Sequence, residues 1–150
     1  MFELRYQSDV VRIWINKSKR LGKAEWRGFL TSEQFRENGL RCVKLCEEEK
    51  LECWLADQRT MRAIRQQDLQ WAALELLPIM LATPLRRMAI IVSVDIFNNM
   101  AMEQLYKRAG SLGNLVIKEF EKEDEALAWL QKPFDVNHES QSFTTHQKDA

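Results

Sequence analysis

The 150-residue chain has none of the long apolar segments that place a protein in or across a membrane. It contains no run of about 18 apolar residues, so we expect no integral membrane segment. Its first ten residues, MFELRYQSDV, lack the basic region and apolar core of a signal peptide. We therefore expect a cytoplasmic protein.

An excess of one charge is also missing. The sequence has 22 Lys and Arg residues against 22 Asp and Glu residues, which gives a formal net charge of zero. No net positive field is available to attract a polyanion, so we expect no nucleic-acid partner.

Motifs that carry catalysis are absent as well. No P-loop, GxGxxG, GxSxG, HExxH or CxxC pattern occurs. The two histidines, His138 and His146, both lie in a polar C-terminal stretch, which makes them poor catalytic bases. We expect a non-enzymatic protein with no catalytic residue, no cofactor and no bound metal.

Cysteine is scarce, and the three present are Cys42, Cys46 and Cys53. Cys42 and Cys46 have the i, i+4 spacing of a helical metal pair, but neither histidine is near them in sequence. An odd number of cysteines on apolar faces is more typical of buried, reduced thiols, because a free cysteine behaves as a small hydrophobic residue.

What the chain does contain is a clear strand, loop, helix, turn and strand between Leu51 and Asp95. The apolar run at 51–56 predicts a strand that ends in a polar loop, Asp57-Gln58-Arg59. Residues 68–82 have one apolar helical face, and Thr83-Pro84 ends that helix. The run MAIIVSV at 88–94 is typical of a strand that is covered on both faces. These patterns predict a βαβ unit.

The flanking segments add further elements to this unit. They predict strands at 2–6, 10–15, 24–29 and 115–120, a helix from the capping box Thr31-Ser32-Glu33-Gln34 to about Glu49, a helix over 97–109, and a last helix from Glu123. Together they predict a single α/β domain over residues 1–132, with a mixed sheet of about five strands and about four helices. Residues 133–150 are polar and predict a flexible tail.

The helix over 68–82 is apolar on most of its circumference, because Trp71 and Leu74 begin a second apolar line. Such a helix is buried on two sides, against the sheet and against a neighbouring helix, a ligand or another subunit. Pro78 lies inside it and predicts a kink that turns Met80 and Leu81 away from the sheet.

Polar residues follow two of the predicted strands, and ligands of open α/β sheets bind beyond the carboxyl ends of strands. Asp57, Arg59 and Thr60 follow the first strand, and Asp95 and Asn98 follow the second. Two interpretations remain open: a loop whose shape is fixed by local hydrogen bonds, or a polar site for recognition or phosphorylation.

The order of several sequence segments resembles the SpoIIAA-like (STAS/Sec14-type) domain family over about residues 2–131. These segments are GFLTSEQFRENGL, ECWLADQRTM, QQDLQWAALELLPIML, LRRMAIIVSVDIF and VIKEFEKEDEALAWL. The resemblance implies an α/β sandwich with a mixed sheet, in the manner of anti-sigma-factor antagonists and lipid-carrying Sec14 domains. The phosphorylated antagonists carry an Asp-Ser-x-Gly turn, where this chain has Asp57-Gln58-Arg59-Thr60, so Thr60 is the nearest hydroxyl.

Two functional hypotheses follow. The first is a regulatory module that binds a protein partner, its own copy included, through Trp71 and Met80 on the doubly apolar helix. The alternative is a carrier or sensor of a small apolar ligand such as a lipid, in a pocket near helices 68–82 and 97–109. The residues that favour this pocket are Phe97, Met100, Met102 and Leu105, since methionines adapt to varied ligands.

Overall fold

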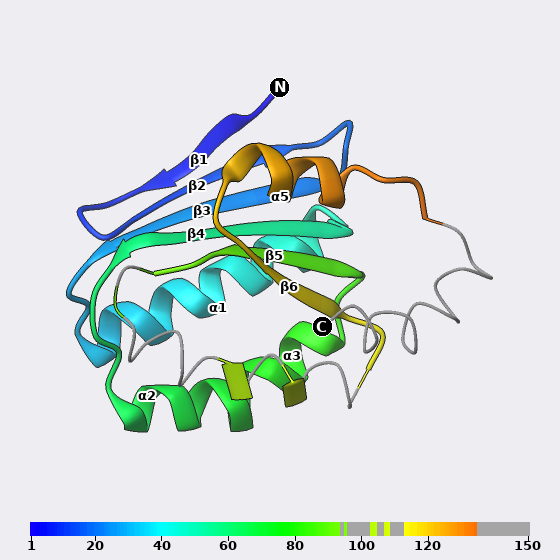
Figure 1. Cartoon of the computed structure of the whole chain (residues 1–150). Coiled ribbons are helices and arrows are strands. Elements are labelled where there is room, and N and C mark those ends of the chain that lie inside the picture. Colours follow the sequence, from blue (N-terminus) through cyan, green and yellow to red (C-terminus); the bar gives the residue numbers. More distant parts are fainter. Residues whose placement is uncertain (94, 96–102, 105–106, 109–112, 135–150) are drawn as a thin grey trace.

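The computed structural model describes residues 1–93, 95, 103–104, 107–108 and 113–134. Within these residues, six strands form one sheet in sequence order (Figure 1). They are β1 (Glu3–Gln7), β2 (Val11–Asn16), β3 (Leu21–Gly28), β4 (Cys53–Met61), β5 (Arg87–Ile91) and β6 (Val116–Phe120). β1, β2 and β3 pair antiparallel, whereas β3, β4, β5 and β6 pair parallel. The predicted mixed sheet is confirmed, with six strands instead of about five.

Helices cover both faces of this sheet. α1 (Ser32–Glu48) joins β3 to β4, and the consecutive segments α2 (Gln66–Trp71), η1 (Ala72–Leu76) and α3 (Leu77–Leu81) join β4 to β5. α1 and the α2–η1–α3 helix lie on one face, and α5 (Glu123–Leu130) lies on the other (Figure 1). Within the described part of the chain, no helix is both long and apolar enough to cross a bilayer.

The helix predicted over 97–109 falls largely outside the described residues, although residues 103–104 and 107–108 are helical. The domain boundary at 132 stays a prediction, because residues 135–150 also lie outside them. Phe134 still contacts the domain, since the guanidinium groups of Arg86 and Arg87 lie 3.9 and 4.5 Å from its ring centroid.

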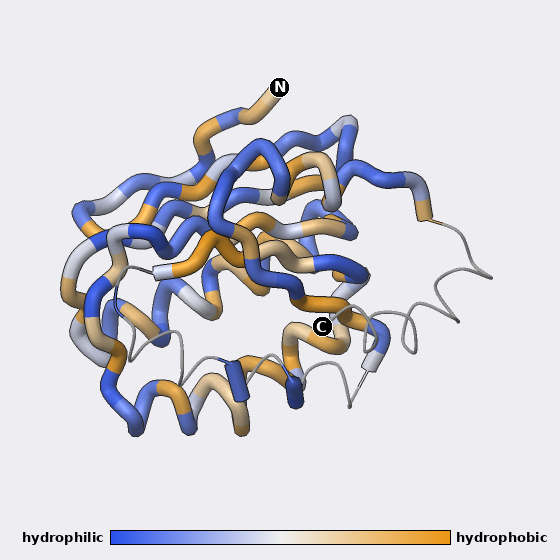
Figure 2. Tube along the Cα trace, viewed as in Figure 1, coloured by the Kyte–Doolittle hydropathy of each residue, from blue (hydrophilic) through white to orange (hydrophobic). Residues whose placement is uncertain are grey.

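Alternation along the central strands divides the core into two layers. Figure 2 shows that apolar residues are concentrated in these strands. Trp54 and Ala56 of β4 face the layer under α1, whereas Leu55 faces the layer under α5. In β5, Ile90 belongs to the first layer and Ala89 to the second. The prediction that this strand is covered on both faces is therefore confirmed.

Local signals at the start of α1 are confirmed too. Gln34 donates its backbone N–H to Thr31 Oγ1 at 3.1 Å, and Gln34 Oε1 accepts from the Thr31 N–H at 2.9 Å. This reciprocal capping box satisfies two donors that the first helical turn leaves without partners. The expected buried thiols are also present, because the thiols of Cys42, Cys46 and Cys53 are all buried.

The predicted loop at 57–59 is wrong, because β4 continues to Met61. The long strand β3 supplies backbone partners beyond Ala56 and pairs Glu25 with Asp57 and Arg27 with Thr60. Two residues of β4, Gln58 and Arg59, therefore lie opposite one residue of β3, which is a β-bulge. Asp57, Arg59 and Thr60 are strand residues and do not form a loop beyond the strand.

The predicted effect of Pro78 is also wrong in direction. The N–H of Leu77 donates to the carbonyl of Ala72, five residues earlier, so a π-type turn precedes the proline. Pro78 then occupies the first turn of α3, where its missing N–H is tolerated. Met80 and Leu81 consequently pack toward the sheet core instead of away from it.

Candidate apolar ligand site

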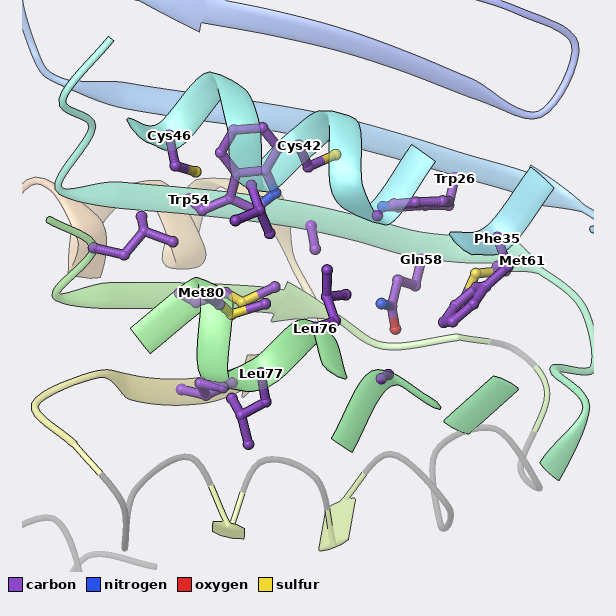
Figure 3. Close-up of a pocket in the computed structure, with 17 residues that line it drawn as sticks. Trp26, Phe35, Cys42, Cys46, Trp54, Gln58, Met61, Leu76, Leu77 and Met80 are labelled. Atoms are coloured by element: carbon purple, nitrogen blue, oxygen red, sulfur yellow. The ribbon is translucent and has the colours of Figure 1, made fainter. Parts of the chain in front are cut away.

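A cavity of about 90 Å³ lies between the sheet and the two helices on its α1 face (Figure 3). Its lining is almost wholly apolar and includes Trp26, Phe35, Trp54, Leu76, Leu77 and Met80. One water molecule needs roughly 10–15 Å³ of such space. The cavity therefore exceeds the small packing voids of an ordinary core.

The sequence places these side chains by simple periodicity. Phe35, Cys42 and Cys46 follow one another at seven and four residues along α1, which keeps them on one helical face. Trp54 and Ala56 point into the cavity because alternate residues of β4 share one side of the sheet.

Gln58 continues this alternation and brings an amide into the apolar lining. It is only 7% exposed, and Figure 3 shows its amide directed away from β4 into the cavity. The bulge then changes the phase of the strand, so that Met61 replaces Thr60 on the cavity side. Sequence reasoning missed Gln58 because it assigned the residue to a loop. If the predicted strand at 51–56 had been extended by two residues, its alternation would have placed the polar side chain of Gln58 on the inward face.

Two thiols also line the cavity. Burial raises the pKa of Cys42 to about 12 and raises that of Cys46 well above its usual value. Both groups are therefore neutral thiols near pH 7, which are weak nucleophiles and weak metal ligands.

The predicted residues Asp57 and Arg59 lie on the opposite face of β4, toward α5. Arg59 donates from Nε and Nη2 to the two carboxylate oxygens of Asp57, and Nη2 is also 3.4 Å from Glu123 Oε1. Lys23 Nζ approaches Glu123 Oε2 at 3.2 Å. The local interpretation is therefore the one that the geometry supports: these charges bind one another and connect β4 to the start of α5.

The protonation of Asp57 reflects this pairing. Burial acts to raise its pKa, but hydrogen bonds from the side chain and backbone of Arg59 outweigh burial, and the pKa is lowered overall. The hydrogen bonds to Asp57 in turn raise the pKa of Arg59. The carboxylate is charged near pH 7 and its oxygens are already occupied.

The other predicted site residues are dispersed. Thr60 is exposed on β4, and its hydroxyl lies 3.4 Å from the carbonyl of Trp26. Trp71 is half-buried, and its ring makes an edge contact with Phe35 at 6.3 Å. Met80 lines the cavity, so among the described residues it is the predicted site residue that belongs to the cavity lining.

Asp95 is linked to the end of β4 through Ser93. The N–H of Asp95 donates to Ser93 Oγ at 3.0 Å, and Ser93 Oγ donates to the carbonyl of Met61 at 2.7 Å. Phe97, Asn98 and Met102 lie outside the described residues, so their predicted roles stay predictions. The chain that follows β5 thus contacts β4 at Met61. This contact lies beside the cavity, since Met61 is one of the residues that line the cavity.

Comparison with known proteins defines the fold class. A solved structure that resembles the chain is an uncharacterised protein of the DUF3478 family from Shewanella loihica PV-4, described as having a SpoIIAA-like fold. The match has a TM-score of 0.52 and 18% identity, and it covers 87% of this chain and 92% of that one. No family model matches the sequence, and no curated protein matches it. The chain has a SpoIIAA-like α/β fold, as the sequence resemblance implied.

Proposed function

We propose that this protein is a non-enzymatic carrier or sensor that binds a small, largely apolar molecule in the cavity between α1, the sheet and the α2–η1–α3 helix. The observation that carries the proposal is the cavity itself, which holds about 90 Å³ among apolar side chains from both helices and the sheet. Burial of a ligand's apolar surface in such a site stabilises the complex by about 25 cal/mol per Å².

Flexible side chains in the lining support this proposal. Met61, Met80 and Met88 all border the cavity. Methionine has three rotatable bonds and a polarisable sulfur, so it can adjust to ligands of different shape. A cavity of about 150 Å³ in an engineered protein core holds benzene. A ligand with a single ring is thus the size that fits here after small movements of these side chains.

The protonation of the two cavity thiols is consistent with a protein that binds a ligand and does not catalyse a reaction. The cavity thiols of Cys42 and Cys46 are held neutral by burial, and activation of a cysteine requires a lowered pKa or an adjacent base. The ion pair of Asp57 and Arg59 lies on the other face of the sheet, away from the cavity.

Toluene is a suitable probe because it is apolar and carries one ring. We expect saturating toluene to raise the melting temperature and to shift the NMR methyl signals of Met61 and Met80. Ala56→Leu should fill the cavity from β4 and abolish both effects, whereas Ala128→Leu, on the exposed side of α5, should retain them. A wild-type protein that does not respond to toluene would refute the proposal.

A second candidate function is docking of a protein partner, specifically a second copy of the chain, on the outer side of the same helix. Leu74 and Ile79, both large apolar residues of this helix, are 63% and 46% exposed. Light scattering of the purified protein should show a doubled mass. Leu74→Glu should reduce it to the monomer mass, and Leu4→Glu on β1 should not. A monomeric wild type would contradict this candidate.

A further inference from the structure

The cavity lining contains one carboxamide side chain, that of Gln58, among residues that are mostly apolar. Gln58 is 93% buried and lines the cavity, and none of the hydrogen bonds found among the described residues involves its amide. Within these residues, Arg12 Nε is the fully buried side-chain polar atom without a partner, so the Gln58 amide still faces accessible space. Figure 3 shows that both polar atoms of the amide point into the cavity, toward the helix that carries Leu76. Polar groups in apolar surroundings nearly always have a hydrogen-bond partner, so this amide offers a hydrogen-bonding position to an occupant of the cavity.

The position of the amide is fixed by the backbone. The bulge at Gln58 and Arg59 opposite Trp26 ends the regular alternation of β4 directly after Gln58. Trp26, itself part of the lining, is 9% exposed and packs on Phe35 with ring centroids 6.3 Å apart. Gln58 thus projects from a strand in the middle of the sheet, opposite Trp26 of β3, and not from a loop.

The remaining lining restricts the charge of any occupant. None of the residues that line the cavity has a charged side chain, and burial keeps the thiols of Cys42 and Cys46 neutral. A carboxylate or phosphate here would lose its hydration without gaining a counter-ion, which is strongly unfavourable. A neutral carboxamide offers both a donor (NH₂) and an acceptor (C=O), as Gln58 does.

From these observations we infer that the ligand has an apolar body of about one ring and a single uncharged head group that both donates and accepts hydrogen bonds, as a primary carboxamide does. The head group pairs with the Gln58 amide, and the ring occupies the space bordered by Trp54, Leu76 and Met80. This inference rests on the proposed function, since it specifies the ligand of the same cavity. It excludes fatty acids and phospholipid head groups from this position.

Three probes of similar size test the inference: benzamide, toluene and benzoate. Their dissociation constants should be measured by NMR titration with the wild type, with Gln58→Met, and with a control, Gln70→Met, whose residue is exposed on α2. Methionine matches glutamine in length but cannot donate a hydrogen bond. We expect Gln58→Met to weaken benzamide binding by about 2- to 10-fold for each of the two neutral hydrogen bonds lost, and to leave toluene binding unchanged. Gln70→Met should match the wild type, and benzoate should not bind.

The outcomes separate the two proposals. If no probe binds the wild type, the proposed function fails and the inference fails with it. If toluene binds but Gln58→Met does not alter the ratio of benzamide to toluene affinity, only the inference is overturned, because water then serves the amide. Binding of benzoate as tight as that of benzamide would also overturn it. If Gln58→Met fails to fold, a measurement on the wild type replaces it. The NMR signals of the Gln58 side-chain NH₂ group should shift more with benzamide than with toluene. Equal shifts would overturn the inference.

Discussion

Arg59 and Asp57, two residues apart on β4, are joined by a pair of parallel hydrogen bonds. Arg59 Nε lies 2.9 Å from Asp57 Oδ1, and Arg59 Nη2 lies 2.6 Å from Asp57 Oδ2. The backbone N–H of Arg59 donates to the same Oδ1 at 3.1 Å. This arrangement uses the planar geometry of the guanidinium, which a lysine cannot reproduce.

Arg59→Lys should therefore lower the free energy of unfolding by about 1 kcal/mol, since it removes one of the two side-chain hydrogen bonds and Arg59 is 47% exposed. Urea denaturation monitored by circular dichroism measures this change. Arg27→Lys on the neighbouring strand is the control and should have little effect. An unchanged unfolding midpoint for Arg59→Lys would contradict the structural role and favour the recognition hypothesis instead.

The same pair predicts a dependence on pH. The folded pKa of Asp57 lies below its unfolded value of about 3.9, so the pair stabilises the fold above that pH. This contribution is lost as the pH falls through the lower, folded pKa. The stability difference between wild type and Asp57→Asn should thus be largest near pH 7 and should shrink below about pH 4. Asp9→Asn, in the exposed β1–β2 turn, is the control; a difference for Asp57→Asn that is constant with pH would contradict the prediction.

Asp68 connects the beginnings of the two helices that border the cavity. It is 1% exposed and accepts hydrogen bonds from Ser32 Oγ at 2.9 Å and from Arg36 Nε at 3.1 Å. Asp68→Ala should lower the free energy of unfolding by about 1–3 kcal/mol. This loss is smaller than that for a fully buried ion pair, because the side chain of Arg36 remains in contact with water. Thermal denaturation should show this loss. The exposed residue Glu75 on the same helix provides the control Glu75→Ala, and equal losses in the two variants would refute the role of Asp68.

Pro78→Ala should change the stability by less than about 0.5 kcal/mol. Proline in a regular helix interior costs about 3 kcal/mol, but here the π-type turn that ends at Leu76 places Pro78 in the first turn of α3. The replacement therefore removes little strain. A melting curve tests this directly, and a gain of several degrees would show that the proline strains the helix.

Much of the fold could be predicted from the sequence because it depends on local patterns. The capping box at Thr31 and Gln34 marks the start of α1 through contacts within one turn, and the observed helix begins at Ser32. The apolar run in β5 predicts a strand covered on both faces, since each face needs its own apolar side chains. The order of these segments was enough to indicate the α/β class.

Tertiary structure decided the end of β4, and with it the candidate site. Polar residues at 57–60 indicate a loop when only neighbours in sequence are considered. The edge of β3 supplies hydrogen-bond partners that hold these residues in a strand, and the bulge opposite Trp26 sets their direction. Asp57 and Arg59 consequently point toward α5, and Gln58 points into the cavity. The sequence alone determined which side chains were available, but pairing between strands distant in the chain determined which of them face the same space.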